Sequence, residues 1–228
     1  MVADLSGLSG YVLAGGRSSR MGRDKAGLEL AGKTLLARAV ETLGVVCDDV
    51  TVVGDREVAE VRQIQDLHAG CGPLGGIEAG LRDVRDLGRG DYAVFLPVDM
   101  PFMPAGLLKV LIGRWREEGD ARVCYVTVDG RPQPLVSMLH REILPTVQEA
   151  LERADFKVVR VLGVAAERLT AKGTGSQDLL RTVEVASFEW LGWEPTAMQW
   201  EARHLWFANL NTPEEFRDAE RYAGALEA

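Results

Sequence analysis

Short apolar runs alternate with stretches of helical spacing along most of this chain. We expect strands at 8–13, 50–53, 61–66, 92–96, 123–128 and 134–139, and helices at 34–46, 75–87, 105–115, 142–151 and 213–225. The run from 92 to 96 is apolar throughout, as in a central strand that is covered on both faces. Strands that alternate with helices are typical of an α/β fold with a mostly parallel sheet.

The pattern weakens between 154 and 205, where we assign no regular element. A glycine- and serine-containing loop is expected at 172–176. Four tryptophans crowd the region that follows, at Trp190, Trp193, Trp200 and Trp206. Such a cluster can stack a planar ligand, but tryptophans more often pack in a core or form a partner surface, which is the interpretation we favour. Beyond it, Thr212, Pro213 and Glu215 predict a capping box at the start of the last helix.

The first apolar run ends in a glycine pair that is followed by a basic loop. Gly15 and Gly16 come directly after the strand and allow the backbone to approach a ligand closely. The loop then carries Arg17, Arg20, Arg23 and Lys25. A basic run alone would indicate a solvated surface turn. This loop, however, directly follows a strand and a glycine pair, and guanidinium and ammonium groups are suited to bind a polyphosphate. We therefore favour a loop that binds a nucleotide triphosphate.

A second polar signal follows the most apolar run. Asp99 stands between Pro97 and Pro101, just past the predicted central strand. An isolated aspartate here would be an ordinary turn residue. Carboxyl ends of parallel strands meet at one edge of the sheet, where ligands bind, so Asp99 and the basic loop are expected to share that edge. Mg²⁺ prefers one or two carboxylates together with substrate phosphates, and Asp99 is therefore our predicted metal ligand.

Two glycine patterns are treated as accidental. The segment 27–34 satisfies the Walker A pattern, but no strand precedes it, and we predict a strand and turn that lead into the helix at Thr34. The segment 70–75 satisfies G-x-G-x-x-G, yet Pro73 removes a backbone donor, so a dinucleotide site is not expected. A loop that touches a base or ribose and a plain helix-entry turn both remain open there.

Composition narrows the function further. A net charge of −8 on 228 residues argues against nucleic acid or an anionic membrane as the main partner. The three cysteines are scattered and odd in number, and they indicate a reducing compartment. We see no signal peptide and no apolar run of membrane-spanning length, so a cytoplasmic protein is expected. The three histidines have no ligand spacing and receive no catalytic role.

Several separated motifs together resemble a known family. They are L-A-G-G-R-S-x-R-M-G-x-D-K from Leu13 to Lys25, G-P-L-G-G at 72–76, Asp99-x-Pro101, the stretch from Gly130 to Leu135, and N-x-N-T-P-E from Asn209. This set resembles the nucleotidyltransferases, and most of all the molybdenum cofactor guanylyltransferases. The resemblance implies a three-layer Rossmann-like fold in a single domain. Its nucleotide-binding half would span about 1–110 and its acceptor-binding half about 111–228.

The resemblance also implies a reaction and residue roles. GMP passes from GTP to the phosphate of molybdopterin with Mg²⁺, and molybdopterin guanine dinucleotide and pyrophosphate are formed. GTP-binding positions would be Leu13, Ala14, Gly15, Lys25, Val53, Asp66 and Asp99. Catalytic positions would be Lys25, Asp99, Arg20 and Arg17, with Asp99 as metal ligand, and Asn209 and Asn211 would face the acceptor. Proteins that deliver molybdopterin or receive the product are expected partners.

Other functions remain open at this point. Within the same class, the nucleotide could be CTP or the acceptor a sugar phosphate. A carrier that binds GTP without chemistry is a hypothesis from another class, and pyrophosphate release would exclude it. A P-loop kinase is disfavoured because no strand precedes Gly27.

Overall fold

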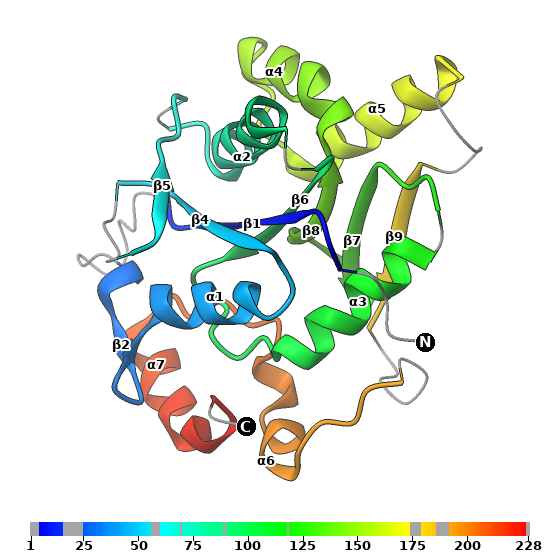
Figure 1. Cartoon of the computed structure of the whole chain (residues 1–228). Helices are drawn as coiled ribbons and strands as arrows, with labels where there is room; N and C mark the ends of the chain where they lie inside the picture. The colour runs from blue at the N-terminus through cyan, green and yellow to red at the C-terminus, as the bar shows by residue number, and fades with distance from the viewer. Residues whose placement is uncertain are drawn as a thin grey trace.

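A sheet with seven strands in the described residues forms the centre of the computed structural model (Figure 1). The structure describes residues 5–15, 25–55, 60–68, 70–88, 90–117, 119–173, 179–185 and 192–226. The strands are β1 (Leu8–Leu13), β4 (Asp49–Val53), β5 (Arg62–Ile64), β6 (Tyr92–Pro97), β7 (Val123–Val128), β8 (Arg131–His140) and β9 (Leu180–Glu184). Their order is β5-β4-β1-β6-β8-β7-β9. Only β8 is antiparallel to its neighbours among these strands, which confirms the mostly parallel sheet.

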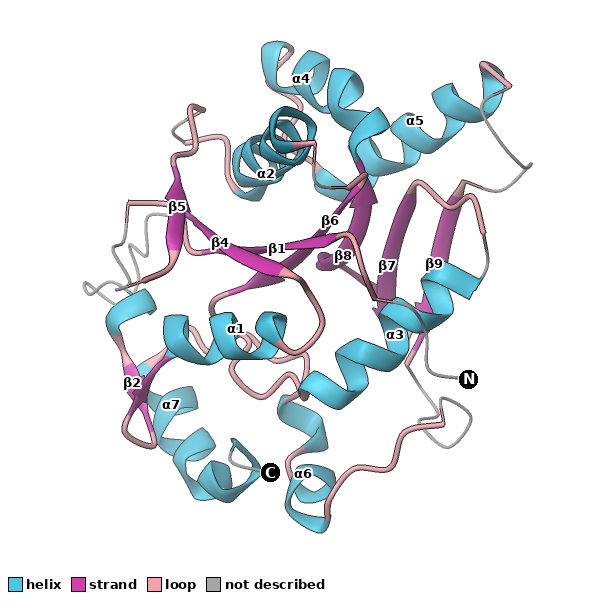
Figure 2. Ribbon diagram, viewed as in Figure 1, coloured by secondary structure: helices cyan, strands magenta, loops and turns pink. Residues whose placement is uncertain are grey.

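Helices cover both faces of the sheet, so the molecule has three layers (Figure 2). The main helices are α1 (Leu35–Gly44), α2 (Pro73–Leu87), α3 (Ala105–Glu117), α4 (Leu144–Glu152), α5 (Val158–Ala171), α6 (Ala197–Glu201) and α7 (Pro213–Ala219). Short 3₁₀ turns are η1 (Lys25–Gly27), η2 (Arg141–Ile143), η4 (Arg203–Leu205) and η5 (Glu220–Leu226). Helices α2, α4 and α5 lie on one face, and the remaining α-helices lie on the other (Figure 1). Within the described ranges, every helix is too short or too polar to cross a bilayer.

Each face of the sheet buries its own apolar core. Leu8 and Val12 of β1 face the core under α1 and α3, whereas Tyr11 and Leu13 face the core under α2. The rings of Tyr11 and Phe95 stack with centroids 5.6 Å apart. These contacts confirm β1 and β6 as central strands that are covered on both sides, and that continuous burial explains why their sequences lack polar alternation.

The segment that satisfies the Walker A pattern is a hairpin. Strands β2 (Glu29–Leu30) and β3 (Lys33–Thr34) pair across a turn in which Ala31 and Gly32 have φ of 50° and 73°. Thr34 caps α1 by accepting a hydrogen bond from the N–H of Ala37. Lys33 forms a surface ion pair with Glu41 at 2.7 Å. The predicted strand and turn are confirmed. Lys33, which would be the phosphate-binding lysine of a Walker A loop, is paired with Glu41 instead.

Two elements in the carboxyl-terminal part were not predicted. Helix α5 begins with the β-branched Val158 and Val159 and contains Gly163, so its first half carries little helix propensity. It is held by packing, because Val161, Leu162, Ala165, Ala166 and Leu169 are buried. Strand β9 pairs only with β7 in the described sheet, and such a short edge strand leaves a weak sequence signal.

The tryptophan cluster is only partly core. Trp206 is buried and its ring lies 5.3 Å from that of Trp193. Trp200 is 44% exposed, with the Arg203 guanidinium 4.7 Å from its ring centroid, so this residue lies at the surface rather than in the core. Trp190 lies outside the described residues. The capping box between Thr212 and Glu215 is confirmed, although α7 gives way to 3₁₀ geometry after Ala219.

Candidate functional site

The carboxyl ends of β1, β4, β5 and β6 meet at one edge of the sheet, as parallel pairing requires. Backbone hydrogen bonds join the turns that follow these strands. The N–H of Ala14 donates to Val53 O at 3.0 Å, and the N–H of Val98 donates to Leu13 O at 3.2 Å. Gly54 N–H donates to Ile64 O at 3.0 Å. The edge is therefore a continuous backbone frame rather than a set of independent loops.

The turns after β1 and β4 touch each other through their backbones. Gly54 has φ of 142°, and a Cβ there would lie 3.2 Å from the N of Gly15. Leu13 and Val53 are buried, and the carbonyl oxygen of each accepts one of the bonds just described. Any ligand contact by these two residues would use the backbone, and their roles remain predictions. Among sequence signals, only the glycine at 54 points to this close approach.

Asp66 packs against the first turn of α2. Its Oδ1 accepts a hydrogen bond of 2.7 Å from the N–H of His68. A Cβ on Gly75 would lie 2.4 Å from that same oxygen, so only glycine fits without a shift. A carboxylate is favoured there because the amino-terminal end of a helix carries partial positive charge. The glycine-rich segment before α2 is thus a helix entry, with Gly72 at φ 64° as the N-cap, that also supports Asp66.

Asp99 follows β6 on the same edge and is half-buried. Its carbonyl oxygen accepts a hydrogen bond of 2.9 Å from the N–H of Leu210. This bond brings Asn209 and Asn211 to the turn after β6, as a shared acceptor site would require. The Asn211 side chain donates to the Asn209 carbonyl at 3.1 Å, and its N–H donates to Glu215 Oε2 at 2.6 Å. The asparagine segment is therefore held from both ends.

Part of the predicted site lies outside the described residues. Arg17 and Arg20 fall there, and for Lys25 only the backbone is described, as the first residue of η1. The next residue, Ala26, is buried in the core beneath α1. That burial anchors the backbone of η1 beside α1, while the roles of the three basic side chains stay predictions.

The donor set can be tested against a divalent metal. The described residues contain no group of three or more His, Cys, Asp or Glu side chains that could hold one. A cage made by the protein alone is therefore absent from this part of the chain. Asp99 at the strand end fits the habit of Mg²⁺, which takes one or two carboxylates and completes its shell with phosphate oxygens and water.

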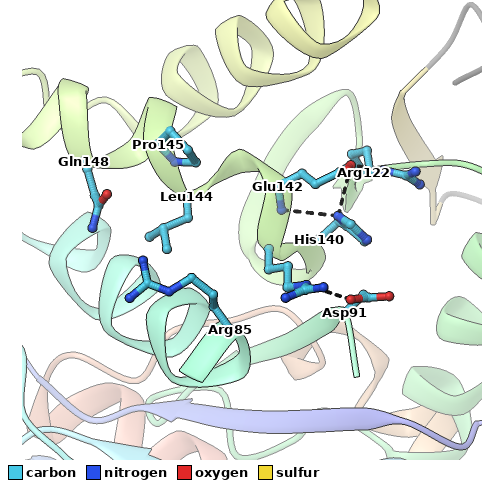
Figure 3. Close-up of a pocket in the computed structure, with 9 residues that line it drawn as sticks. Arg85, Asp91, Arg122, His140, Glu142, Leu144, Pro145 and Gln148 are labelled. Atoms are coloured by element: carbon cyan, nitrogen blue, oxygen red, sulfur yellow. Dashed lines mark hydrogen bonds and ion pairs between the residues drawn. The ribbon is translucent and has the colours of Figure 1, made fainter. Parts of the chain in front are cut away.

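A separate cavity of about 550 Å³ lies at the opposite edge of the sheet (Figure 3). It is lined by Arg85, Asp91, Arg122, His140, Arg141, Glu142, Leu144, Pro145 and Gln148. Most of its charged side chains form ion pairs. Arg122 Nε lies 2.7 Å from Glu142 Oε2, and Arg141 Nε lies 2.7 Å from Asp91 Oδ1. Burial lowers the pKa of His140 to about 4, so this ring is neutral at pH 7. The cavity lies at the amino-terminal ends of β6 and β7, away from the edge that carries Asp66 and Asp99, and no local sequence motif predicts it.

Comparisons with known proteins agree with the fold and identify a family. The family described as the MobA-like NTP transferase domain matches residues 10–169. A molybdenum cofactor guanylyltransferase of Photobacterium profundum is 31% identical, over 92% of this chain and 93% of its own length. A probable molybdenum cofactor guanylyltransferase of Opitutus terrae is 33% identical, over 97% and 98%. The fold resembles that of the molybdopterin-guanine dinucleotide biosynthesis protein A of Archaeoglobus fulgidus, with a TM-score of 0.70, 24% identity, and 95% and 98% of the two chains covered.

Proposed function

The chain belongs to the MobA-like NTP transferase family, and we propose that it transfers GMP from GTP to the phosphate of molybdopterin. The observation that carries the proposal is the meeting of Ala14–Gly15, Asp66, Asp99 and Asn209–Asn211 at one sheet edge. Relatives named for this activity, matched over nearly their full length, support the choice of substrates.

The reaction needs positioning and charge stabilisation rather than a protein nucleophile. An oxygen of the molybdopterin phosphate attacks the α-phosphorus of GTP. The bond from that phosphorus to the bridging oxygen breaks, and pyrophosphate leaves with the electron pair. Backbone groups at Ala14 and Gly15 would hold the nucleotide in line for this displacement, and Asp66 would contact it from the loop before α2. Lys25, with Arg17 and Arg20, would offset the charge that develops on the phosphates.

The Asp99 carboxylate would hold Mg²⁺ together with the triphosphate. The bound ion would supply neutralisation of phosphate charge. The Leu210 hydrogen bond fixes the backbone of Asp99, so its carboxylate starts from a defined place at the strand end. Asn209 and Asn211 would face the acceptor, because the same bond sets them beside Asp99. Proteins that deliver molybdopterin or receive the finished cofactor belong to the proposal as partners, as does a cytoplasmic location.

The hypothesis is tested by pyrophosphate release. Purified protein with Mg²⁺ should release pyrophosphate only when GTP and molybdopterin are both present. Release that follows CTP instead would keep the site and change the nucleotide, and release with a sugar phosphate would change the acceptor. A carrier without chemistry would bind GTP and release none. Because Asp66, Asp99 and the asparagine segment share one edge, we expect turnover.

A further inference from the structure

A buried carboxylate on α2 has no role in the mechanism above. Glu78 is 1% exposed, and its Oε1 accepts a hydrogen bond of 2.9 Å from the side-chain amide of Gln148 on α4. Its Oε2 is also buried and has no hydrogen-bond partner among the described residues. An ionised group in such a place is costly to bury, because burial removes its hydration. Its presence therefore calls for a function.

The second oxygen of Glu78 faces two basic side chains. Arg82 Nη1, one turn further along α2, lies 3.7 Å from Oε2, and His68 Nε2 lies 4.0 Å from it. His68 belongs to the loop between β5 and α2, and its ring is partly exposed. The carboxylate thus joins three segments, which are the loop, α2 and α4.

The same loop carries Asp66. The N–H of His68 donates a hydrogen bond of 2.7 Å to Asp66 Oδ1. The backbone amide of His68 thus contacts Asp66, while its ring lies near Glu78. Gly75, almost one helical turn before Glu78, contacts the Asp66 carboxylate. Helix α2 therefore touches the loop at two points on one side, with Gly75 against Asp66 and Glu78 against His68. The two contacts restrict the positions of Asp66 and His68 relative to α2.

We propose that Glu78 is a positioning residue for nucleotide binding. Its Oε2 lies 4.0 Å from His68 Nε2, beyond hydrogen-bonding distance, and this contact positions His68, whose amide in turn orients Asp66 toward the carboxyl edge of the sheet. This inference rests on the proposed function, because Asp66 is assigned there as a nucleotide contact. Gln148 secures the carboxylate from α4 and leaves its other oxygen for His68 and Arg82.

The test begins with Glu78→Gln, which keeps the shape and an acceptor for Gln148 but removes the charge. We expect the KM for GTP to rise about fivefold to tenfold while kcat changes less than about twofold, because a binding contact is loosened and no transition-state contact is lost. Amide hydrogen exchange in the free protein should accelerate at His68 and not along β1. Glu149→Gln on α4, which removes an exposed carboxylate paired with Arg168, is the matched control and should change neither quantity.

His68→Ala gives a second route if Glu78→Gln folds poorly, since His68 is partly exposed. The double variant should show no more than the larger single effect on KM, because both changes act on one contact. Additive effects, or an unchanged KM with unchanged exchange at His68, would overturn the inference. The exchange measurement uses the free protein. If the wild type releases no pyrophosphate from GTP, the proposed function fails, and exchange at His68 still decides whether Glu78 holds the loop.

Discussion

The N–H of Leu210 donates a hydrogen bond of 2.9 Å to the carbonyl oxygen of Asp99. It joins the turn after β6 to a segment near the end of the chain. Neither partner uses its side chain in this bond, which therefore fixes the backbone of Asp99 beside that of the asparagine segment. The bond gives the nucleotide-binding half and the acceptor-binding half, whose division remains a prediction, a common fixed point.

Replacement of Asp99 by asparagine should abolish transfer without unfolding the protein. Removing one preorganised charged group from a site of this kind costs roughly a hundredfold or more in rate. The Leu210 bond uses the Asp99 backbone and survives the change, so thermal unfolding should shift by less than about 2 °C, which for a chain of this length is less than about 1 kcal/mol of stability. Pyrophosphate release and calorimetry measure the two effects. Asp86→Asn, on the exposed part of α2, is the control and should keep normal turnover.

Two lysines that both look suited to phosphate should behave differently. Lys25→Ala should reduce turnover by roughly a hundredfold, since the ammonium is assigned to the phosphates. Lys33→Ala removes a surface ion pair with Glu41 and should change the rate by less than about twofold. Steady-state kinetics with GTP compare the two variants directly. The opposite ranking would restore the phosphate-loop hypothesis that the β2–β3 hairpin argues against.

Two helical glycines should respond in opposite ways to alanine. In Gly75→Ala the new methyl group would lie 2.4 Å from Asp66 Oδ1, so Asp66 or α2 must shift. We expect a loss of about 1–3 kcal/mol in unfolding free energy and weaker GTP binding. In Gly163→Ala nothing lies within 4 Å of the added methyl group. That change should stabilise α5 by about 0.5–1 kcal/mol and leave GTP binding unchanged, as urea titrations and calorimetry would measure.

His140 should make stability depend on pH. Burial lowers its pKa in the folded protein to about 4 from a usual value of 6.5. Between pH 6.5 and pH 4 this histidine is protonated in the unfolded chain but not in the folded protein. The free energy of unfolding is therefore highest above pH 6.5 and falls as the pH drops toward 4. His140→Gln keeps an acceptor for the Glu142 N–H but cannot titrate. Urea unfolding at pH 7, 6 and 5 should give a flatter profile for the variant, and parallel profiles would contradict the assignment.

Local signals account for what was predictable in the site. The apolar strands that are followed by Gly15 and by Asp99 can be recognised from a few consecutive residues. Parallel pairing of these strands then places both residues at one edge of the sheet. The contacts between Asp66 and Gly75 and between Leu210 and Asp99 were not predictable, because they depend on how separate elements pack. Helix α5 and strand β9 were not predictable because they too depend on packing between separate elements. The first valines of α5 favour a strand, and the only described partner of β9 is β7.

The most direct test of the central claim is the identity of the nucleotide in the product. Wild-type protein would be incubated with Mg²⁺, molybdopterin and equal concentrations of GTP and CTP. The dinucleotide products would then be separated, identified and quantified by mass spectrometry. We predict molybdopterin guanine dinucleotide as the main product, with pyrophosphate in equal amount, and an initial rate from Asp99→Asn that is lower by roughly a hundredfold or more. A cytosine dinucleotide as the main product, or no dinucleotide at all, would contradict the proposed function.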